Sequence, residues 1–222
     1  MRYSILALAA LVASTTVHAQ DADRSVKGGI AVAGWKGRID RRPAGQGKTI
    51  NDSKFVQEGK DFRLSIGPAA FYYNPANTAS GDYTVKATFK EHKMTASHPH
   101  SYGIFIGGND LEGESETLMY CIAYGNGTYS VKTFHGSNVQ TLVNLEKSPA
   151  LKQADATGAS TNEIGWTVKG GKASCVINGT VVHSFDKGDV VAGDKLKSLD
   201  GVYGIRVSHN VELTVSSFGV SK

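Results

Sequence analysis

The sequence predicts an all-β protein built as an antiparallel β-sandwich. Two observations carry this prediction. Glycine makes up 26 of the 222 residues, while apolar patterns of helix length are few. Short apolar runs with period-two alternation recur along the chain, and Gly, Asn and Asp residues separate them. Many short strands joined by tight turns are typical of a sandwich or a barrel, not of alternating strands and helices.

The clearest strand is DYTVKATFKE at 82–91. Tyr83, Val85 and Phe89 share one face of it, while polar and charged residues occupy the other. Successive side chains of a strand point to opposite faces, so one face should be buried and the other solvated. The other predicted strands, in chain order, are FRLSIG (62–67), AAFYY (69–73), YGIFIGG (102–108), TLMYCIAYG (117–125), TYSVKTF (128–134), VQTLVNL (139–145), EIGWTVKG (163–170), ASCVING (173–179), TVVHSF (180–185), VYGIRVS (202–208) and VELTVSSFGV (211–220).

Turn residues connect several of these strands. Gly125–Asn126–Gly127, Gly170–Gly171 and Asn178–Gly179 each stand between two apolar runs and tolerate the positive φ of tight hairpins. In the last strand the apolar residues change parity near Ser216–Ser217, which predicts a β-bulge that returns Phe218 and Val220 to the core.

Two segments lack a strand pattern. The stretch 148–162 is rich in Ala, Ser and Thr and is predicted to be a surface loop. The stretch 37–49, GRIDRRPAGQGKT, is predicted to be an exposed basic connector. Trp35, just before it, is either a plug at a sheet edge or a solvent-facing platform.

The N-terminus predicts export. Residues 1–19 combine Arg2, an apolar run and small residues before Gln20, which is typical of a signal peptide. We therefore expect a periplasmic or secreted protein with one domain at 20–222. No later run reaches the roughly 18 apolar residues of a membrane helix. Basic residues are scattered among acidic ones, so we predict neither a membrane nor a nucleic-acid partner.

The chain contains two cysteines, Cys121 and Cys175, each inside a predicted strand. An exported compartment permits a disulfide. A disulfide also requires that the two Cα atoms lie within about 7 Å, which a sequence does not show. A bridge and a pair of buried thiols therefore both remain open.

The second half of the chain carries a recognisable order of motifs. Asn162-x-Ile164-x-Trp166-x-Val168 is followed by Gly170–Gly171, by VINGTVV at 176–182 and by GVYGIRV at 201–207. This order resembles the concanavalin A-like lectin/glucanase superfamily, and within it secreted bacterial domains of the 3-keto-disaccharide hydrolase-like or laminin-G-like type. The resemblance covers about residues 34–220. It implies an antiparallel jelly-roll β-sandwich, with Trp166 in its core.

The superfamily's retaining glucanases carry alternating carboxylates on one strand, because acid and nucleophile flank the scissile bond. Glu112 and Glu116, in the segment EGESE at 112–116, are the nearest approach and are the candidate catalytic residues. They lie in a Gly-containing link, and the strand that follows, 118–124, has no carboxylate. A solvated acidic loop is the alternative interpretation.

Polar and aromatic residues concentrate between 97 and 135. Seven of them are the candidate ligand-binding residues: His98, His100, Tyr102, Asn109, Asp110, Tyr124 and His135. We expect no cofactor and no metal site. Ca²⁺ bound by the oxygens of 109–116 or 186–194 is one alternative left open. A site built on His98 and His100 with His92 or His135 as the third ligand is another.

The sequence thus predicts a secreted, lectin-like protein that recognises a glycan or a modified sugar. Two alternatives stand beside it. One is a hydrolase acting on a glycoside such as a 3-keto-disaccharide, and the other is a structural or surface interaction domain without a small ligand. The Walker, HExxH and GxSxG motifs are absent from the sequence, which disfavours the enzyme classes built on them.

Overall fold

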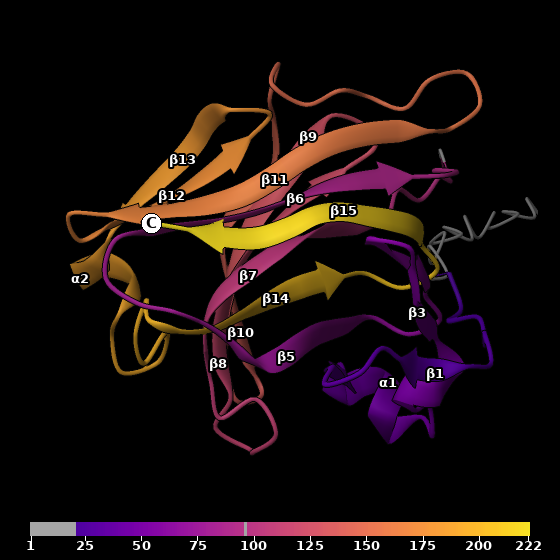
Figure 1. Cartoon of the computed structure of the whole chain (residues 1–222), viewed down its shortest axis with the longest axis horizontal. Helices are drawn as coiled ribbons and strands as arrows, with labels where there is room; N and C mark the ends of the chain where they lie inside the picture. The colour runs from indigo at the N-terminus through magenta and orange to yellow at the C-terminus, as the bar shows by residue number, and fades with distance from the viewer. Residues whose placement is uncertain (1–20, 96) are drawn as a thin grey trace, which may run out of the picture.

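Two sheets pack face to face in the computed structural model, which describes residues 21–95 and 97–222 (Figure 1). The predicted signal peptide lies outside the described residues. The first sheet has eight strands in the order β1 (Gly29–Ala31), β3 (Lys54–Glu58), β4 (Asp61–Ser65), β15 (Glu212–Ser221), β6 (Tyr83–Glu91), β11 (Ser160–Lys169), β12 (Lys172–Ile177) and β13 (Thr180–Asp186). All neighbours in it are antiparallel except β1 and β3, which are parallel.

The second sheet has seven antiparallel strands. Their order is β10 (Asn138–Lys147), β9 (Thr128–His135), β8 (Thr117–Tyr124), β7 (Ser101–Asn109), β14 (Gly201–Val207), β5 (Ala70–Ala79) and β2 (Lys36–Ile39). Short helical turns are α1 (Arg41–Gly45), a 3-10 turn at Ile50–Asp52, and α2 (Lys187–Val190). None of the helices in the described part of the chain is long and apolar enough to cross a membrane.

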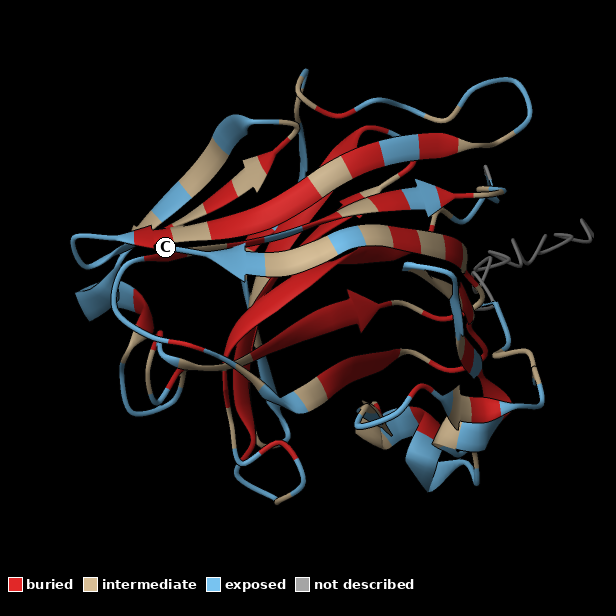
Figure 2. Ribbon diagram, in the orientation of Figure 1, coloured by how far each residue is buried: buried red, intermediate tan, exposed pale blue. Residues whose placement is uncertain are grey.

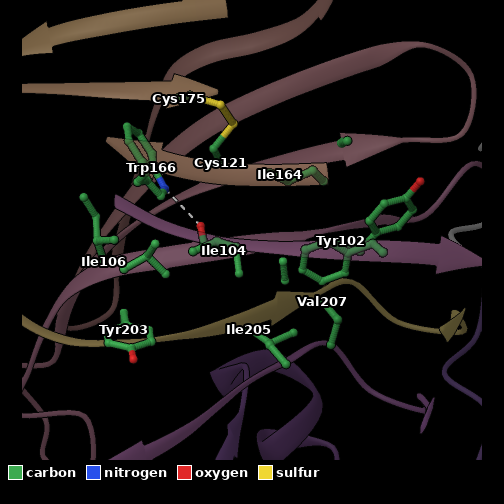
Figure 3. Close-up of a cluster of buried hydrophobic side chains, with 14 of the residues drawn as sticks. Tyr102, Ile104, Ile106, Cys121, Ile164, Trp166, Cys175, Tyr203, Ile205 and Val207 are labelled. Carbon is green, nitrogen blue, oxygen red and sulfur yellow. Dashed lines mark hydrogen bonds between the residues drawn. A yellow bond between two sulfur atoms is a disulfide. The ribbon is translucent and has the colours of Figure 1, made fainter. Parts of the chain in front are cut away.

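The core between the sheets follows the period-two prediction. Parity with neighbouring apolar residues predicts burial at eight positions, and all eight are buried: Tyr83, Val85, Phe89, Trp166, Val168, Ile177, Ile205 and Val207. The indole N–H of Trp166 donates a hydrogen bond to the carbonyl oxygen of Ile104, 3.1 Å away on the opposite sheet (Figure 3). A buried indole with its polar atom satisfied costs no desolvation penalty.

A disulfide joins the two sheets through the core. Cys121 on β8 bonds to Cys175 on β12, with the Cα atoms 6.1 Å apart (Figure 3). Both cysteines are fully buried. Of the two states that the sequence leaves open, the structure has the bridge.

The turns and the bulge lie where the sequence predicts them. Gly170 and Gly171, like Asn178 and Gly179, adopt positive φ at two hairpins. In β15 the register shifts between Ser216 and Gly219. The bulge returns Phe218 to the core but not Val220, which is 42% exposed, so that half of the prediction was wrong.

Trp35 is a plug at the sheet edge. Its ring packs edge-on against Phe55 and Phe62, with centroids 5.1 and 4.9 Å away. The segment after Trp35 differs from the predicted connector, because it forms β2 and α1 and carries charged residues onto the second sheet. The predicted 148–162 loop ends earlier than expected, at the start of β11.

Candidate functional site

The seven-stranded sheet is apolar on both faces. Met119, Cys121 and Ala123 of β8 point into the core between the sheets, whereas Leu118, Tyr120 and Ile122 point outward into a second buried cluster. Figure 2 shows β7 buried along nearly its whole length. A strand buried on both faces reads as a continuous apolar run, as LMYCIAY does.

A cleft of about 830 Å³ lies on this outer face. Its floor comes from β8, β9 and β14, and its rim comes from three chain segments distant in sequence, 21–23, 40–48 and 97–100. Its lining residues include Asp40, Tyr120, Tyr124, Lys132, Arg206 and His209. A volume of this size is typical of small-molecule sites.

An ion pair between a buried arginine and a partly exposed aspartate lies at the floor. Arg206 is 7% exposed, and its two terminal nitrogens donate to the two carboxylate oxygens of Asp40 at 2.6 and 2.7 Å. The chain positions Asp40 at the end of β2, where its backbone N–H donates to the carbonyl oxygen of Ala69. Two parallel hydrogen bonds fix the plane of a guanidinium as well as its distance.

Aromatic rings support the same guanidinium. The Cζ atom of Arg206 lies 5.2 Å from the ring centroids of both Tyr120 and Phe134, within the range of cation–π attraction. Gly103 is the register partner of Arg206 on β7, so no side chain stands between Arg206 and β8. Burial alone lowers the pKa of Arg206, but Asp40 and Tyr120 outweigh it and hold that pKa above its ordinary value.

Lys132 on β9 completes the cationic floor. Burial, and then the nearby Arg206, lower the pKa of its ammonium group, and Asp40 opposes them. Among the described residues no carboxylate lies within ion-pair distance of Lys132. A half-buried ammonium without an anionic partner is a group that a ligand can satisfy.

Three histidines meet at one end of the cleft. Tyr102 pairs with Val207 across β7 and β14, and continuing this antiparallel register places His100 opposite His209. Their ring centroids lie 4.5 Å apart, and that of His98 lies 5.2 Å from His100 and 5.9 Å from His209. Burial, followed by the two neighbouring histidines, lowers the pKa of His100 to about 4.

Three of the seven predicted ligand-binding residues line the cleft, namely His98, His100 and Tyr124. Tyr102 is in the wrong place for direct contact, because it is fully buried between the sheets and its hydroxyl lies 2.9 Å from that of Ser160. The even-numbered residues of β7, Tyr102, Ile104 and Ile106, face the core between the sheets. His135 ends β9 and does not line the cleft.

Asn109 and Asp110 shape a turn instead of lining the cleft. The side-chain amide of Asn109 donates to the carbonyl oxygen of Gly107 at 3.1 Å. Asp110 adopts φ of +52° and accepts a hydrogen bond from the backbone N–H of Ser115. Asn and Asp commonly stabilise turns through such local bonds.

The candidate catalytic carboxylates are both engaged in ion pairs. Glu112 is exposed and lies 2.6 Å from Lys36. Glu116 is buried and lies 2.8 Å from Arg41 and 3.6 Å from Arg38. The acidic loop is therefore docked on β2 and α1, and Glu116 in particular is not a solvated loop residue. Neither glutamate lines the cleft.

The comparisons with known proteins bear on the fold. No protein-family model and no curated protein sequence matches the chain. Among solved structures, a galectin-like protein of unknown function from Bacillus subtilis has a TM-score of 0.57 at 13% identity, covering 84% of this chain and 88% of its own. The carbohydrate binding module CBM66 from Bacillus subtilis has a TM-score of 0.56 at 9% identity, covering 88% and 99%. The chain has a concanavalin A-like jelly-roll fold. An endo-beta-1,3-glucanase from Pyrococcus furiosus shares it, with a TM-score of 0.50 at 14% identity and coverage of 84% and 87%.

Structural similarity at such low sequence identity shows the architecture of the chain and not its chemistry. The jelly-roll fold that the superfamily resemblance implies is thereby confirmed, while the finer resemblance to 3-keto-disaccharide hydrolase-like domains stays a prediction. The expected absence of a cofactor stays a prediction, and Ca²⁺ stays its alternative. Among the described residues, His98, His100 and His209 are the group that brings three metal-ligating side chains together.

Proposed function

We propose that the protein is an exported carbohydrate-binding protein, and that it holds a glycan in the cleft on the outer face of the seven-stranded sheet. The jelly-roll fold supports this proposal, since the chain shares that fold with a carbohydrate binding module and a glucanase. The buried disulfide supports export, because disulfides persist in oxidising compartments.

The observation that carries the proposal is the rigid polar floor of the cleft. Asp40 and two aromatic rings hold Arg206 in one orientation, and Lys132 stands beside it without a carboxylate. Groups held in place before binding lose little entropy when a ligand arrives. Sugars need such fixed hydrogen-bonding groups together with an apolar surface, which Tyr124 at the cleft wall provides.

Binding accounts for this arrangement better than glycoside hydrolysis does. A hydrolase of the usual kind requires two carboxyl groups flanking the bond. Within the cleft, both oxygens of Asp40 accept from Arg206, and Asp21 and Asp23 lie beside the histidines at one end. The predicted pair, Glu112 and Glu116, forms ion pairs with basic residues away from the cleft. The hydrolase and the interaction domain without a small ligand remain as outcomes that the experiment separates.

The test is a glycan screen followed by titration calorimetry with the best ligand. Lys132→Met removes the ammonium group and keeps most of the apolar stem. We expect it to weaken binding by roughly 10- to 100-fold, the value of one hydrogen bond from a charged group. Lys172→Met is the matched control, because Lys172 is exposed on β12 of the other sheet, where it pairs with Asp186.

Three results would contradict the proposal. Equal binding by the Lys132→Met and wild-type proteins would place the glycan elsewhere. Turnover of the bound sugar would favour the hydrolase. No binding to any member of neutral and uronic-acid oligosaccharide panels would favour the interaction domain.

A further inference from the structure

The three-histidine cluster has the composition of a transition-metal site. The nitrogen ligand atoms of His98, His100 and His209 all lie within 4.8 Å of one another. Imidazole suits Zn²⁺, Cu²⁺ and Ni²⁺, whereas Ca²⁺ and Mg²⁺ prefer oxygen. Three nitrogens bound to one tetrahedral ion at about 2.0 Å stand roughly 3.3 Å apart. Small side-chain rotations therefore suffice to close the cluster around an ion.

Two ring nitrogens in the cluster are buried without hydrogen-bond partners. They are Nε2 of His100 and Nδ1 of His209, on residues that are 3% and 7% exposed. A buried polar atom without a partner loses its hydrogen bonds to water and gains none in return, so its presence calls for an explanation. A metal ion that accepts the lone pairs of these nitrogens would provide one.

Carboxylates stand next to both of these nitrogens. Oδ2 of Asp21 lies 3.5 Å from Nε2 of His100, and Oδ1 of Asp23 lies 2.8 Å from Nδ1 of His209 without forming a hydrogen bond. These two aspartates place negative charge beside the cluster, which attracts a cation. They also supply oxygen atoms to complete a coordination shell.

We propose that His98, His100 and His209 bind one divalent transition-metal ion, with Asp21 or Asp23 beside it. His100 and His209 come from paired strand ends, which fixes two ligands in the scaffold. His98 is exposed and approaches from the loop before β7. The ion would lie at the rim of the cleft, with one side open to solvent.

The test uses metal ions alone, with the untagged full-length protein stripped by EDTA. Calorimetry with Zn²⁺ should show one ion bound per chain, and Ca²⁺ under the same conditions should not bind. At a Zn²⁺ concentration of about 100 Kd, the melting temperature should rise by about 5–10 °C. A Zn²⁺ stoichiometry near zero, or equal binding of Ca²⁺, would overturn the proposal.

Variants place the ion. His98→Gln changes an exposed residue, so the fold should survive, as circular dichroism will show. Loss of a ligand should weaken Zn²⁺ binding by at least about 100-fold, since even groups that only orient ligands are worth 10- to 100-fold. His135→Gln, the matched control, should bind as the wild type does. Zn²⁺ binding by His98→Gln at wild-type affinity would refute the site.

This inference is separable from the proposed glycan binding. The titration contains no sugar, so its failure leaves the glycan proposal standing. Conversely, Lys132→Met protein should bind Zn²⁺ with wild-type affinity, whatever happens to its sugar affinity. A loss of Zn²⁺ affinity in that variant would contradict the assignment of the ligands to the histidines.

Discussion

Reducing the buried disulfide should cost a large part of the protein's stability. Cys121 and Cys175 are 54 residues apart in sequence, and their bridge ties β8 in one sheet to β12 in the other. In the chain-entropy description, a closed loop of this length removes about 14 cal/mol/K from the unfolded state, which corresponds to about 4 kcal/mol at 25 °C. For a domain of this size that loss lowers the melting temperature by about 8–16 °C.

The assay compares urea unfolding of the oxidised and the fully reduced protein. Reduction keeps every other side chain in place, so the difference in the free energy of unfolding reports the cross-link. A Cys121→Ala variant, which cannot form the bridge, should unfold close to the reduced wild type. The m-value should rise on reduction, because the uncrosslinked unfolded chain exposes more surface.

Two results would refute this reasoning. One is a stability difference below about 1 kcal/mol between the two states, which would mean that the loop constraint does not act on the unfolded chain. The other is a titre of two free thiols in the unfolded but unreduced protein, which would mean that the bridge does not form.

Three further predictions concern Glu91, the glutamates Glu112 and Glu116, and the N-terminus of the exported protein. Burial raises the pKa of Glu91 from 4.5 to about 7, so its contribution to stability is present below pH 4.5 and is lost as pH rises through 7. Over that range, the free energy of unfolding in urea should fall by about 3 kcal/mol relative to Glu91→Gln. Parallel pH profiles of the two proteins would contradict this. Glu116→Gln should lower the free energy of unfolding, measured by thermal unfolding, by about 2 kcal/mol, because it leaves two arginines without their buried partner. Glu112→Gln, at an exposed pair, should lower it by less than about 0.5 kcal/mol. Equal losses in the two variants would contradict the difference in burial. Intact mass of the exported protein should correspond to a chain starting at or near Gln20, and retention of residues 1–19 would contradict the signal peptide.

The sequence predicts the sandwich because strand burial and tight turns are local properties. In a run such as 82–91 the alternation of apolar and polar residues identifies the buried face. Asn178–Gly179 identifies a turn because both residue types tolerate the positive φ that they adopt. Trp166 falls in the core for the same reason. Even the bulge in β15 is visible, as a change of parity near Ser216.

The cleft could be predicted only in part, because it depends on which strands are neighbours. Asp40 and Arg206 are 166 residues apart, and no local pattern joins them. His209 reads as a turn residue until the pairing of β7 with β14 sets it opposite His100. Two signals were available: an arginine inside the apolar run GVYGIRV, and the run LMYCIAY, apolar in both parities and hence buried on both faces.

The charges on the outer face support the proposal that this face serves recognition and not only packing. Replacing a buried ion pair with well-packed apolar residues is often neutral or stabilising, so folding alone does not explain why this position carries Arg206 and Asp40. Apolar neighbours already cover much of the face, through Phe71, Phe105 and Leu118. Charge interrupts this cover at the floor of the cleft, where Lys132 has no carboxylate within ion-pair distance among the described residues. Charged groups held rigidly inside a hollow are useful to a ligand that needs their hydrogen bonds, and the Lys132→Met and His98→Gln variants measure separately what the two ends of that hollow bind.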